Sequence, residues 1–413
     1  MRLGNKVEGG TLSNSRRYLR RLFLATWNAS MLVFVSCGLL PLWLLQSIKL
    51  PRRHSSRSIW AGTPILTLPV LAQGERMLGV DSSTLVYETY FLSDTFDYNF
   101  SRWFATPIVR LTFPYAIFLW ACWKFQRFHF FCDTGLLPRF GTRRFSLYEL
   151  RAYHLTKKQV FFYTYGADVR TTLKTKALGK YNCCLECPEP GRACICDDES
   201  GDTNILAISR YATAVFSIGD LIEYTPGSRN DLFFWPLDLE AEEGEKYRPR
   251  YPSELSESPI RIVHAANHRH FKGTHYLIDA VDRLRTEGLQ IELELVEGIP
   301  NREALELYRA ADIVFDQCLI GFHGYVAIEA MALGKPLIAY IRKPEKYLLD
   351  DEKCPIINCK PDQIGLVLRE LTESRKRLHE LGIAGRRYVE EYFSVEAFSQ
   401  RLRRAYDELG VIP

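Results

Sequence analysis

The sequence predicts an α/β protein with two domains, each built around a parallel sheet. A chain of 413 residues, 47% of them hydrophobic, is long enough to bury two ordinary cores. Short apolar runs typical of strands alternate with helical segments on both sides of residues 241–259. That stretch is rich in Glu, Pro, Ser and Gly, which indicates a linker. We therefore expect an N-terminal domain over residues 58–240 and a C-terminal domain over residues 260–413.

The first 57 residues form a separate, basic segment. They carry ten Lys or Arg against the single acid Glu8, so subtracting their +9 from the net +4 of the chain leaves −5 elsewhere. Because the basic residues do not belong to a folded domain, the pattern argues against nucleic-acid binding. Leu22 to Ile48 has 27 residues without a charged side chain, which is too long for a signal peptide. It predicts a membrane-anchor helix over about 22–48; the alternative is a helix lying in the membrane interface or buried in the fold.

Residues 58–240 contain the first series of alternating elements. An apolar run that begins at Ser58 leads into a helix ended by Gly79, and a strand follows at 84–91. A second apolar run, at 113–125, is too short to span a membrane, so we expect a core helix that Pro114 breaks. The other expected elements are a helix at 147–155, strands at 128–132, 160–165 and 214–218, and a polar, cysteine-rich insertion at 171–203.

After the linker the alternation restarts. We expect strands at 260–264, 291–296, 313–316, 336–341 and 355–359. Helices are expected at 276–285, at 303–310 behind an Asn301 cap, and at 325–333, with three more filling 362–409.

Three segments of the C-terminal half follow predicted strands, and ligands of open parallel sheets gather at the carboxyl ends of strands. The first is a basic loop from His264 that closes on Lys272 and Gly273 at the start of a helix, where backbone donors and an ammonium can hold a diphosphate. The second runs from Gly321 through Gly324 to Glu329 on a helix. The third is Ile299-Pro-Asn301, a short turn that could meet a nucleobase.

These motifs resemble the donor domain of family 4 (group 1) glycosyltransferases, which have the GT-B fold. Lys272-Gly273-Thr before an apolar helix, then Glu329-Ala-Met-Ala-Leu-Gly-Lys-Pro, carry the resemblance, which covers about residues 260–410. It implies two Rossmann-like domains facing across a cleft. It also implies that Lys272 contacts the donor phosphates and that Glu329 binds the ribose hydroxyls, which a carboxylate can do with two charge-assisted hydrogen bonds.

The chain departs from the family pattern at two positions. Gly321 stands where a second Glu is usual, and Asn267 stands where an Arg is usual. Arg269, His268 or His270 could supply the missing cation from the same loop. The predicted donor-binding residues are Asn267, Arg269, Lys272, Gly273, Gly321, Gly324 and Glu329.

In the N-terminal half, Gly62-Thr-Pro, Phe131-Cys-Asp133 and Tyr165-Gly-Ala-Asp168-Val-Arg170 resemble acceptor-side loops of the same enzymes. Asp133 and Asp168 are the candidate catalytic bases if the transfer inverts; if it retains, the leaving diphosphate can accept the proton and no base is needed. The alternative for each aspartate is a helix cap or turn residue, and for Asp168 also an ion pair with Arg170. His129, between two Phe residues, is expected to be a packed core histidine.

The insertion holds five of the eleven cysteines: Cys183, Cys184, Cys187, Cys194 and Cys196. Two close cysteine groups with a Pro/Gly turn between them could fold onto one tetrahedral ion, which predicts a structural zinc or, alternatively, an iron–sulfur cluster. A redox-active disulfide or unpaired surface thiols are the other interpretations. The other cysteines are scattered through apolar elements, so a reducing compartment fits best.

The sequence thus predicts a glycosyltransferase that moves a sugar from a UDP- or GDP-sugar to a polysaccharide, lipid-linked or other envelope acceptor. We expect no metal requirement for the transfer itself, and a membrane-associated protein with both domains on the cytoplasmic side. Three alternatives remain open. They are a sugar-nucleotide epimerase of the related fold, a non-catalytic membrane-bound module that binds sugar nucleotides, and a redox or metal sensor fused to an inactive transferase.

Overall fold

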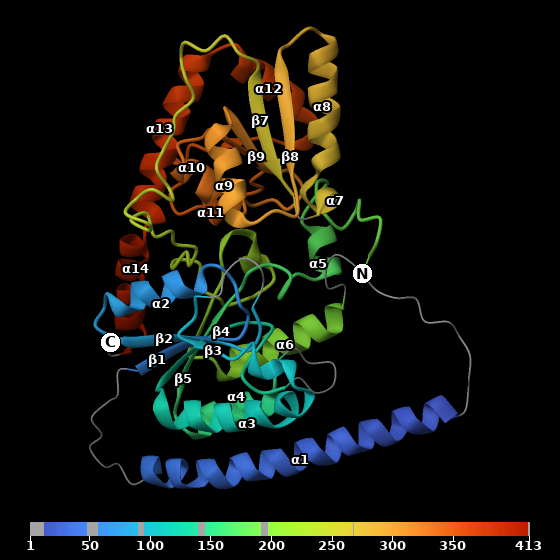
Figure 1. Ribbon diagram of the computed structural model, residues 1–413, viewed down its shortest axis with the longest axis vertical. Helices are drawn as coiled ribbons and strands as arrows, with labels where there is room; N and C mark the ends of the chain where they lie inside the picture. The colour runs from blue at the N-terminus through green and yellow to red at the C-terminus, as the bar shows by residue number, and fades with distance from the viewer. Residues whose placement is uncertain are drawn as a thin grey trace.

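The computed structural model describes residues 12–47, 57–89, 95–138, 145–190, 197–266 and 268–411. Two α/β bodies are stacked along the long axis, the N-terminal one below and the C-terminal one above in Figure 1. Each is built on a parallel sheet whose central strands are buried, as expected of sheets covered on both faces. The predicted α/β class with two parallel sheets is confirmed.

The N-terminal sheet has six parallel strands in the order β3-β2-β1-β4-β5-β6. Its central strands are apolar and aromatic, and β1 pairs with β4 so that Trp60 lies beside His129. The strand bounds are β1 Arg57–Ala61, β2 Asp81–Val86, β3 Tyr98–Asn99, β4 Arg127–Phe131, β5 Gln159–Tyr163 and β6 Ala214–Phe216.

The C-terminal sheet has five parallel strands in the order β11-β10-β9-β7-β8. Residues 241–259 contain no helix or strand. The strand bounds are β7 Ile260–Ala265, β8 Ile291–Val296, β9 Ile313–Gln317, β10 Leu337–Ala339 and β11 Ile357–Asn358.

Helices cover both sheets (Figure 1). In the N-terminal half they are α2 Leu68–Arg76, α3 Pro107–Lys124, α4 Leu147–Leu155, α5 Thr172–Ala177 and α6 Asp198–Tyr211. In the C-terminal half they are α7 Arg269–Lys272, α8 Thr274–Thr286, α9 Asn301–Ala310, α10 Tyr325–Ala332, α11 Pro344–Tyr347, α12 Ile364–Thr372, α13 Arg375–Tyr392 and α14 Val395–Glu408.

Three sequence predictions need correction. The second strand lies at Asp81–Val86 and not at 84–91, because Tyr87 already belongs to the following loop. Helix α3 begins at Pro107 and continues through Pro114, since buried residues after the proline, among them Phe118, hold the helix by tertiary packing. The insertion 171–203 is only partly irregular, because it contains α5 and the first turns of α6.

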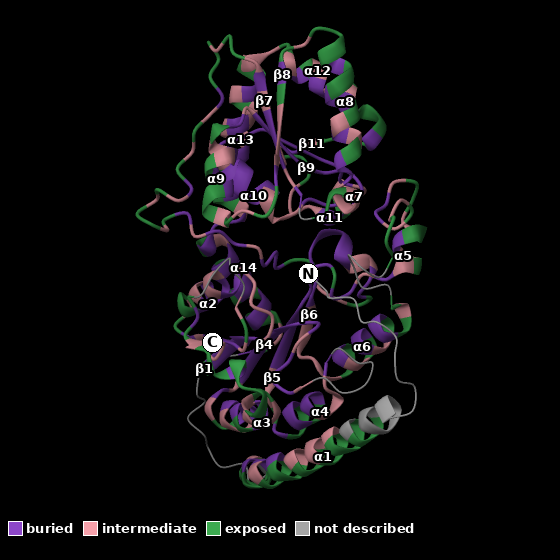
Figure 2. Ribbon diagram, turned by 45° about the vertical axis from the view of Figure 1, so that its right-hand side comes forward, coloured by how far each residue is buried: buried purple, intermediate pink, exposed green. Residues whose placement is uncertain are grey.

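The N-terminal helix α1, Leu12–Ser47, lies flat against α3 at the outer end of the N-terminal body (Figures 1 and 2). Within it, Arg21–Gln46 has a mean hydropathy of 1.8 and is long and apolar enough to cross a membrane. Specific hydrogen bonds join the two helices: Trp27 Nε1 donates to the Leu111 carbonyl at 3.1 Å and Tyr115 Oη donates to Asn28 Oδ1 at 2.6 Å.

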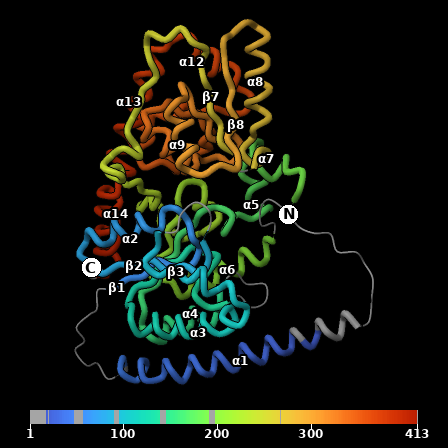
Figure 3. The backbone as a smooth tube through the Cα atoms, in the orientation of Figure 1, coloured from blue at the N-terminus to red at the C-terminus, as the bar shows by residue number. Residues whose placement is uncertain are grey.

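The last helix returns to the N-terminal body and braces the two halves (Figure 3). Tyr406 Oη on α14 donates to Glu75 Oε1 on α2 at 2.6 Å, deep in the N-terminal core. His129 is fully buried there, with its Nδ1 2.8 Å from Tyr163 Oη and its ring stacked 4.0 Å from that of Trp60. The prediction that His129 is a packed core histidine is confirmed.

Candidate functional site at the facing sheet edges

Both sheets have a topological switch point, a place where successive connections leave in opposite directions. In the C-terminal sheet it lies between β7 and β9, and in the N-terminal sheet between β1 and β4. Loops diverge at such points and leave a crevice at the carboxyl ends of the strands, where ligands of α/β proteins bind. The residues that follow these strands therefore form the candidate site.

Lys272 and Gly324 are brought together by Asp316, which sequence reasoning did not identify as a site residue. Lys272 Nζ lies 2.7 Å from Asp316 Oδ1, and the Gly324 N–H donates to the other carboxylate oxygen. Asp316 is fully buried; burial acts to raise its pKa, but the Lys272 ammonium outweighs burial and holds the pKa below its usual value. An aspartate near the end of a predicted strand, directly after the apolar residues Ile313 to Phe315, was the signal that could have revealed it.

This arrangement places an ammonium at the N-terminus of α10, the end of a helix that favours anions. A bound diphosphate could take up the ammonium and the Gly324 N–H in place of Asp316. A side chain at position 324 would crowd the site, because its Cβ would lie 3.2 Å from Asp316 Oδ1.

Glu329 lies on α10 and is 2% exposed. Its Oε1 accepts a hydrogen bond of 3.0 Å from Asn301 Nδ2 at the start of α9. Burial raises the pKa of Glu329 to about 7, since Asn301 and Lys246 offset only part of the desolvation. A buried carboxyl with one neutral partner is suited to accept further hydroxyl donors.

The predicted Asn301 cap is wrong. Pro300 occupies the N-cap position of α9, and the Asn301 amide is turned toward Glu329 instead. The structure thus joins the Ile299-Pro-Asn301 turn to Glu329, two features that the sequence placed in separate loops.

His264 and Gly273 hold the loop after β7 in place. The His264 ring bridges the Phe315 carbonyl at 2.9 Å and Thr274 Oγ1 at 2.8 Å, and burial lowers its pKa to about 4. Gly273 has φ +78°, and a Cβ there would lie 2.4 Å from Cys318 Sγ, so only glycine fits. The loops after β7 and β9 are therefore locked together around Lys272.

Arg269 does not stand free in this structure. Its guanidinium makes two hydrogen bonds of 2.8 Å with the Glu297 carboxylate, and both side chains are about half exposed. Asn267, the position of the usual Arg, lies outside the described residues.

The Arg342 guanidinium fills the space into which a side chain at position 321 would extend. Gly321 has φ +91°, and a Cβ would lie 2.3 Å from Arg342 Nη1. Arg342 Nη2 donates to the carbonyls of Ile320 and Tyr181, at 3.1 and 3.2 Å. The position where the family has a carboxylate thus has a guanidinium beside it, and any side chain there is both strained and crowded.

On the N-terminal sheet edge, hydrogen bonds to Asp133 join the loops that follow β1, β4 and β5. Asp133 Oδ1 accepts a hydrogen bond of 2.5 Å from Thr63 Oγ1 after β1, and its Oδ2 accepts one of 2.9 Å from Tyr165 Oη after β5. Gly62 allows the close approach, because a Cβ there would lie 2.4 Å from the Thr134 carbonyl oxygen. The structure therefore unites the three segments that sequence analysis proposed.

Asp168 is fully buried and shapes the loop after β5. Its Oδ1 accepts from the N–H groups of Tyr165 and Gly166, at 3.0 and 2.8 Å. Burial, together with repulsion from Asp133, raises the pKa of Asp168 to about 7. Arg170, which the sequence offered as an alternative ion-pair partner of Asp168, makes hydrogen bonds of 2.7 and 2.8 Å with Asp220.

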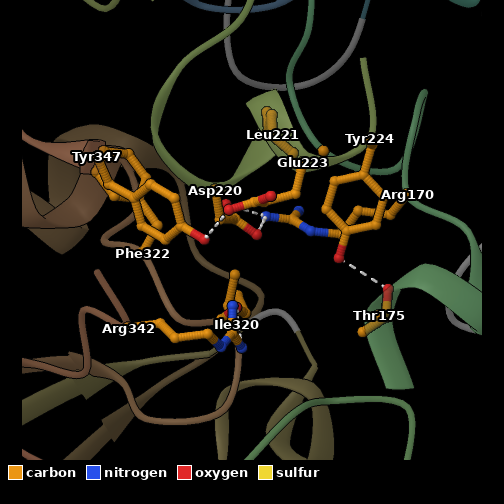
Figure 4. Close-up of polar contacts among 12 residues, drawn as sticks. Arg170, Thr175, Asp220, Leu221, Glu223, Tyr224, Ile320, Phe322, Arg342 and Tyr347 are labelled. Atoms are coloured by element: carbon orange, nitrogen blue, oxygen red, sulfur yellow. Dashed lines mark hydrogen bonds and ion pairs between the residues drawn. The ribbon is translucent and has the colours of Figure 1, made fainter. Parts of the chain in front are cut away.

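Polar contacts fix how the two edges face each other, as Figure 4 shows. Glu223 Oε1 of the N-terminal half accepts from Lys343 Nζ at 2.8 Å and from Tyr347 Oη at 2.9 Å. Burial acts to raise the pKa of Glu223, but these donors hold it at about 2. Arg170 and Arg342 approach the same interface from opposite sides.

A pocket of about 450 Å³ lies between the halves, beside α2 and α9. Val70 and Thr95 line it from the N-terminal side, and Lys246, Asn301 and Arg302 line it from the linker and α9. Asn301 also contacts Glu329, so the pocket adjoins the Glu329 carboxyl. Its size suits a nucleoside.

The predicted metal site remains a prediction. Cys183, Cys184 and Cys187 are free thiols, and Cys194 and Cys196 lie outside the described residues. Within the described part of the chain, no three His, Cys, Asp or Glu side chains are grouped as metal ligands. Cys183 instead packs in an apolar cluster with C-terminal residues such as Cys318 and Leu319.

Comparison with known proteins establishes the fold. No protein-family model and no curated protein sequence matches the chain. Among solved structures, HepE of Anabaena in complex with UDP-glucose aligns with a TM-score of 0.51 at 13% identity, covering 85% of this chain and 99% of HepE. Sucrose-phosphate synthase of Thermosynechococcus elongatus aligns with a TM-score of 0.54 at 14% identity, covering 86% and 99%. The chain has a GT-B-like fold.

Proposed function

We propose that this protein is a glycosyltransferase that takes a sugar from a UDP- or GDP-sugar and transfers it to an envelope acceptor. The C-terminal edge binds the donor, with Lys272 on the diphosphate, Glu329 on the ribose and the Asn301 pocket around the base. The N-terminal edge binds the acceptor, and Asp133 serves as base if the reaction inverts. No metal takes part in the transfer, because Lys272 and the α10 N-terminus hold the diphosphate.

One observation carries this proposal. Lys272 contacts Asp316, Asp316 accepts from Gly324 at the start of α10, and Glu329 lies on the same helix. Lys272 and Glu329 were predicted separately to bind phosphate and ribose, and a pocket of nucleoside size lies beside them. The acceptor is a polysaccharide or a lipid-linked glycan, and both domains lie on the cytoplasmic side, where nucleotide sugars are made. The predicted domain limits, 58–240 and 260–413, and a structural zinc or iron–sulfur cluster on the five insertion cysteines belong to the same proposal.

Calorimetry on the full-length protein in detergent tests the donor site. UDP, GDP, ADP and their common sugar conjugates are titrated against the wild type and Glu329→Ala. We expect selective binding of one base, lost in the variant. A folded wild type that binds none of them overturns the proposal.

A second candidate is a non-catalytic module that binds sugar nucleotides. The Arg342 guanidinium beside Gly321 favours it, since no carboxylate reaches the sugar from that position. Binding without incorporation of labelled sugar into membrane lipid or polysaccharide would establish this candidate in place of the enzyme.

A further inference from the structure

Helix α1 is apolar on all sides, and only one side faces the protein. Val35, Leu39 and Leu42 follow a helical spacing and are buried against the body. Eight other large apolar side chains of α1 are 41–62% exposed: Leu22, Phe23, Val33, Phe34, Leu40, Trp43, Leu44 and Leu45. A helix that is hydrophobic all round requires apolar surroundings on its open side as well.

Neighbouring elements extend this exposed apolar area. Trp103, Ile108 and Trp123, at the start and end of the α3 region, are 59%, 67% and 47% exposed. Figure 2 shows α1 at the outer end of the N-terminal body, with α3 and α4 directly beside it. We call the exposed apolar residues of α1 together with these three the basal surface. Contiguous apolar patches of this kind mark interaction sites.

The charge on the elements that carry the basal surface is mostly positive, and one exposed acid, Glu88, pairs with Arg110 of α3 at 3.9 Å. The sequence contains no Asp or Glu from residue 9 to residue 74, and none in α3. The only acid in α4, Glu149, is fully buried. Arg and Lys residues flank the apolar stretch of α1 on both sides. An apolar strip between basic flanks is complementary to an anionic lipid surface.

The contacts of α1 define its direction relative to such a surface. Trp27 near one end donates to the Leu111 carbonyl, Trp123 donates to the Gly38 carbonyl at 3.1 Å, and Lys157 donates to the Gln46 carbonyl at 3.4 Å. These contacts extend over roughly 28 Å of helix, nearly the whole ~30 Å thickness of a hydrocarbon core. A crossing helix would carry α3 and Lys157 into the bilayer with it.

We propose that the basal surface lies in the plane of an anionic bilayer, so that the chain is a monotopic membrane protein and not a membrane-spanning one. The exposed side chains of α1, with Trp103, Ile108 and Trp123, enter the boundary between headgroups and acyl chains. Arg21, the exposed basic residue at the start of the apolar stretch, contacts lipid phosphates. The inference goes beyond the transfer reaction and holds whether or not the chain is an enzyme.

Vesicle flotation of the full-length protein tests lipid binding. The protein, diluted from detergent, is mixed with vesicles of phosphatidylcholine or of phosphatidylcholine with one quarter phosphatidylglycerol. We expect flotation that is stronger with phosphatidylglycerol. The double variant Phe34→Glu/Leu44→Glu alters only exposed positions and should lower the partition coefficient about tenfold or more.

The matched control is Leu255→Glu/Leu366→Glu, which makes the same chemical change at exposed leucines of the linker and α12. It should float like the wild type. Equal loss in both variants, or a wild type that stays at the bottom and forms a dimer by light scattering, overturns the proposal. Nucleotide binding measured on the same samples separates this result from any failure of the donor site.

Protease protection tests the orientation of α1. A cleavable tag is placed before Met1 and another after Pro413, and inverted membrane vesicles are prepared from the expressing cells. Cleavage of both tags without detergent is expected for a helix in the membrane plane. Protection of the N-terminal tag alone shows a spanning helix and overturns the proposal.

Discussion

The two sheet edges that face each other differ in how their charged groups are partnered. On the C-terminal edge, Lys272 is paired with buried Asp316 and Arg269 with Glu297. On the N-terminal edge, Asp133 is held by the hydroxyls of Thr63 and Tyr165. The first edge must exchange partners when an anion binds, whereas two hydroxyl donors already hold the Asp133 carboxylate on the second. Under the proposed function, the first edge binds phosphate and the second transfers a proton.

The largest expected effect tests Asp133, the carboxylate of the N-terminal edge. Asp133→Asn keeps the shape of the side chain but removes the base, so in an inverting transfer sugar incorporation should fall roughly 10²- to 10⁴-fold while donor affinity stays unchanged. Incorporation of radiolabelled sugar and calorimetry measure the two quantities. Incorporation at the wild-type rate would contradict the role of Asp133 as base.

Asp168→Ala is the comparison variant on the same edge. It leaves the N–H groups of Tyr165 and Gly166 without their acceptor, which should cost about 1–3 kcal/mol of folding free energy. Thermal denaturation should therefore separate the two aspartates: a lower melting temperature for Asp168→Ala and little change for Asp133→Asn.

The second effect addresses phosphate binding. Lys272→Met should weaken binding of the preferred nucleoside diphosphate roughly 10- to 100-fold, because a charge-assisted hydrogen bond is lost. The uncharged nucleoside should bind as before. Calorimetry with both ligands gives the answer, and an equal loss for the nucleoside would show that Lys272 supports the fold and does not contact phosphate.

The third effect uses the pKa of Glu329, raised by burial to about 7. In the free protein the carboxyl stays protonated up to that pH, and ribose hydroxyls favour the ionised form. Nucleotide affinity should therefore rise by about tenfold as the pH increases from 5 to 8. Glu329→Gln should remove this rise.

The raised pKa of Glu329 also makes the stability of the protein fall as the pH rises. The folded-state pKa lies above the ordinary 4.5, so Glu329 lowers stability progressively as the pH rises from about 4.5 to 7. Glu329→Gln should gain stability relative to the wild type at pH 8 compared with pH 4, as thermal melts would show. An identical pH profile for both proteins would contradict the buried, protonated state.

The smallest effect concerns Arg269. Its ion pair with Glu297 is about half exposed, and such pairs contribute little to stability. Arg269→Ala should change the melting temperature negligibly and nucleotide affinity less than about threefold. A loss as large as that of Lys272→Met would show that Arg269 leaves Glu297 to bind the donor.

The sequence was most informative where periodicity and short-range chemistry determine structure. Strand 291–296 and the number of helices that fill 362–409 were predicted correctly, because apolar alternation is a local signal. The pairing of Lys272 with Asp316 joins residues 44 positions apart, and no local pattern encodes it. The docking of α1 on α3 is likewise tertiary, since the same apolar run suits a spanning helix equally well.

Gly321 is a second position at which the sequence alone could not predict the structure of the site. The sequence shows that a carboxylate is missing there, but only the structure places Arg342 in the vacated space. Gly321→Glu would place a side chain on a backbone of positive φ and against the Arg342 guanidinium. Introducing only the carboxylate that is usual in the family 4 pattern should therefore destabilise the loop.

The return of α14 to the N-terminal body has a consequence for biosynthesis. Glu75 needs the Tyr406 hydroxyl, and Gly74 has the Phe398 ring against it, so the first-made sheet lacks part of its cover until the last helix has left the ribosome. Domains usually fold in the order of their synthesis. Here the N-terminal half completes its core only after the C-terminal half has been translated, and a chain stalled before residue 395 would expose that unfinished surface to chaperones and proteases.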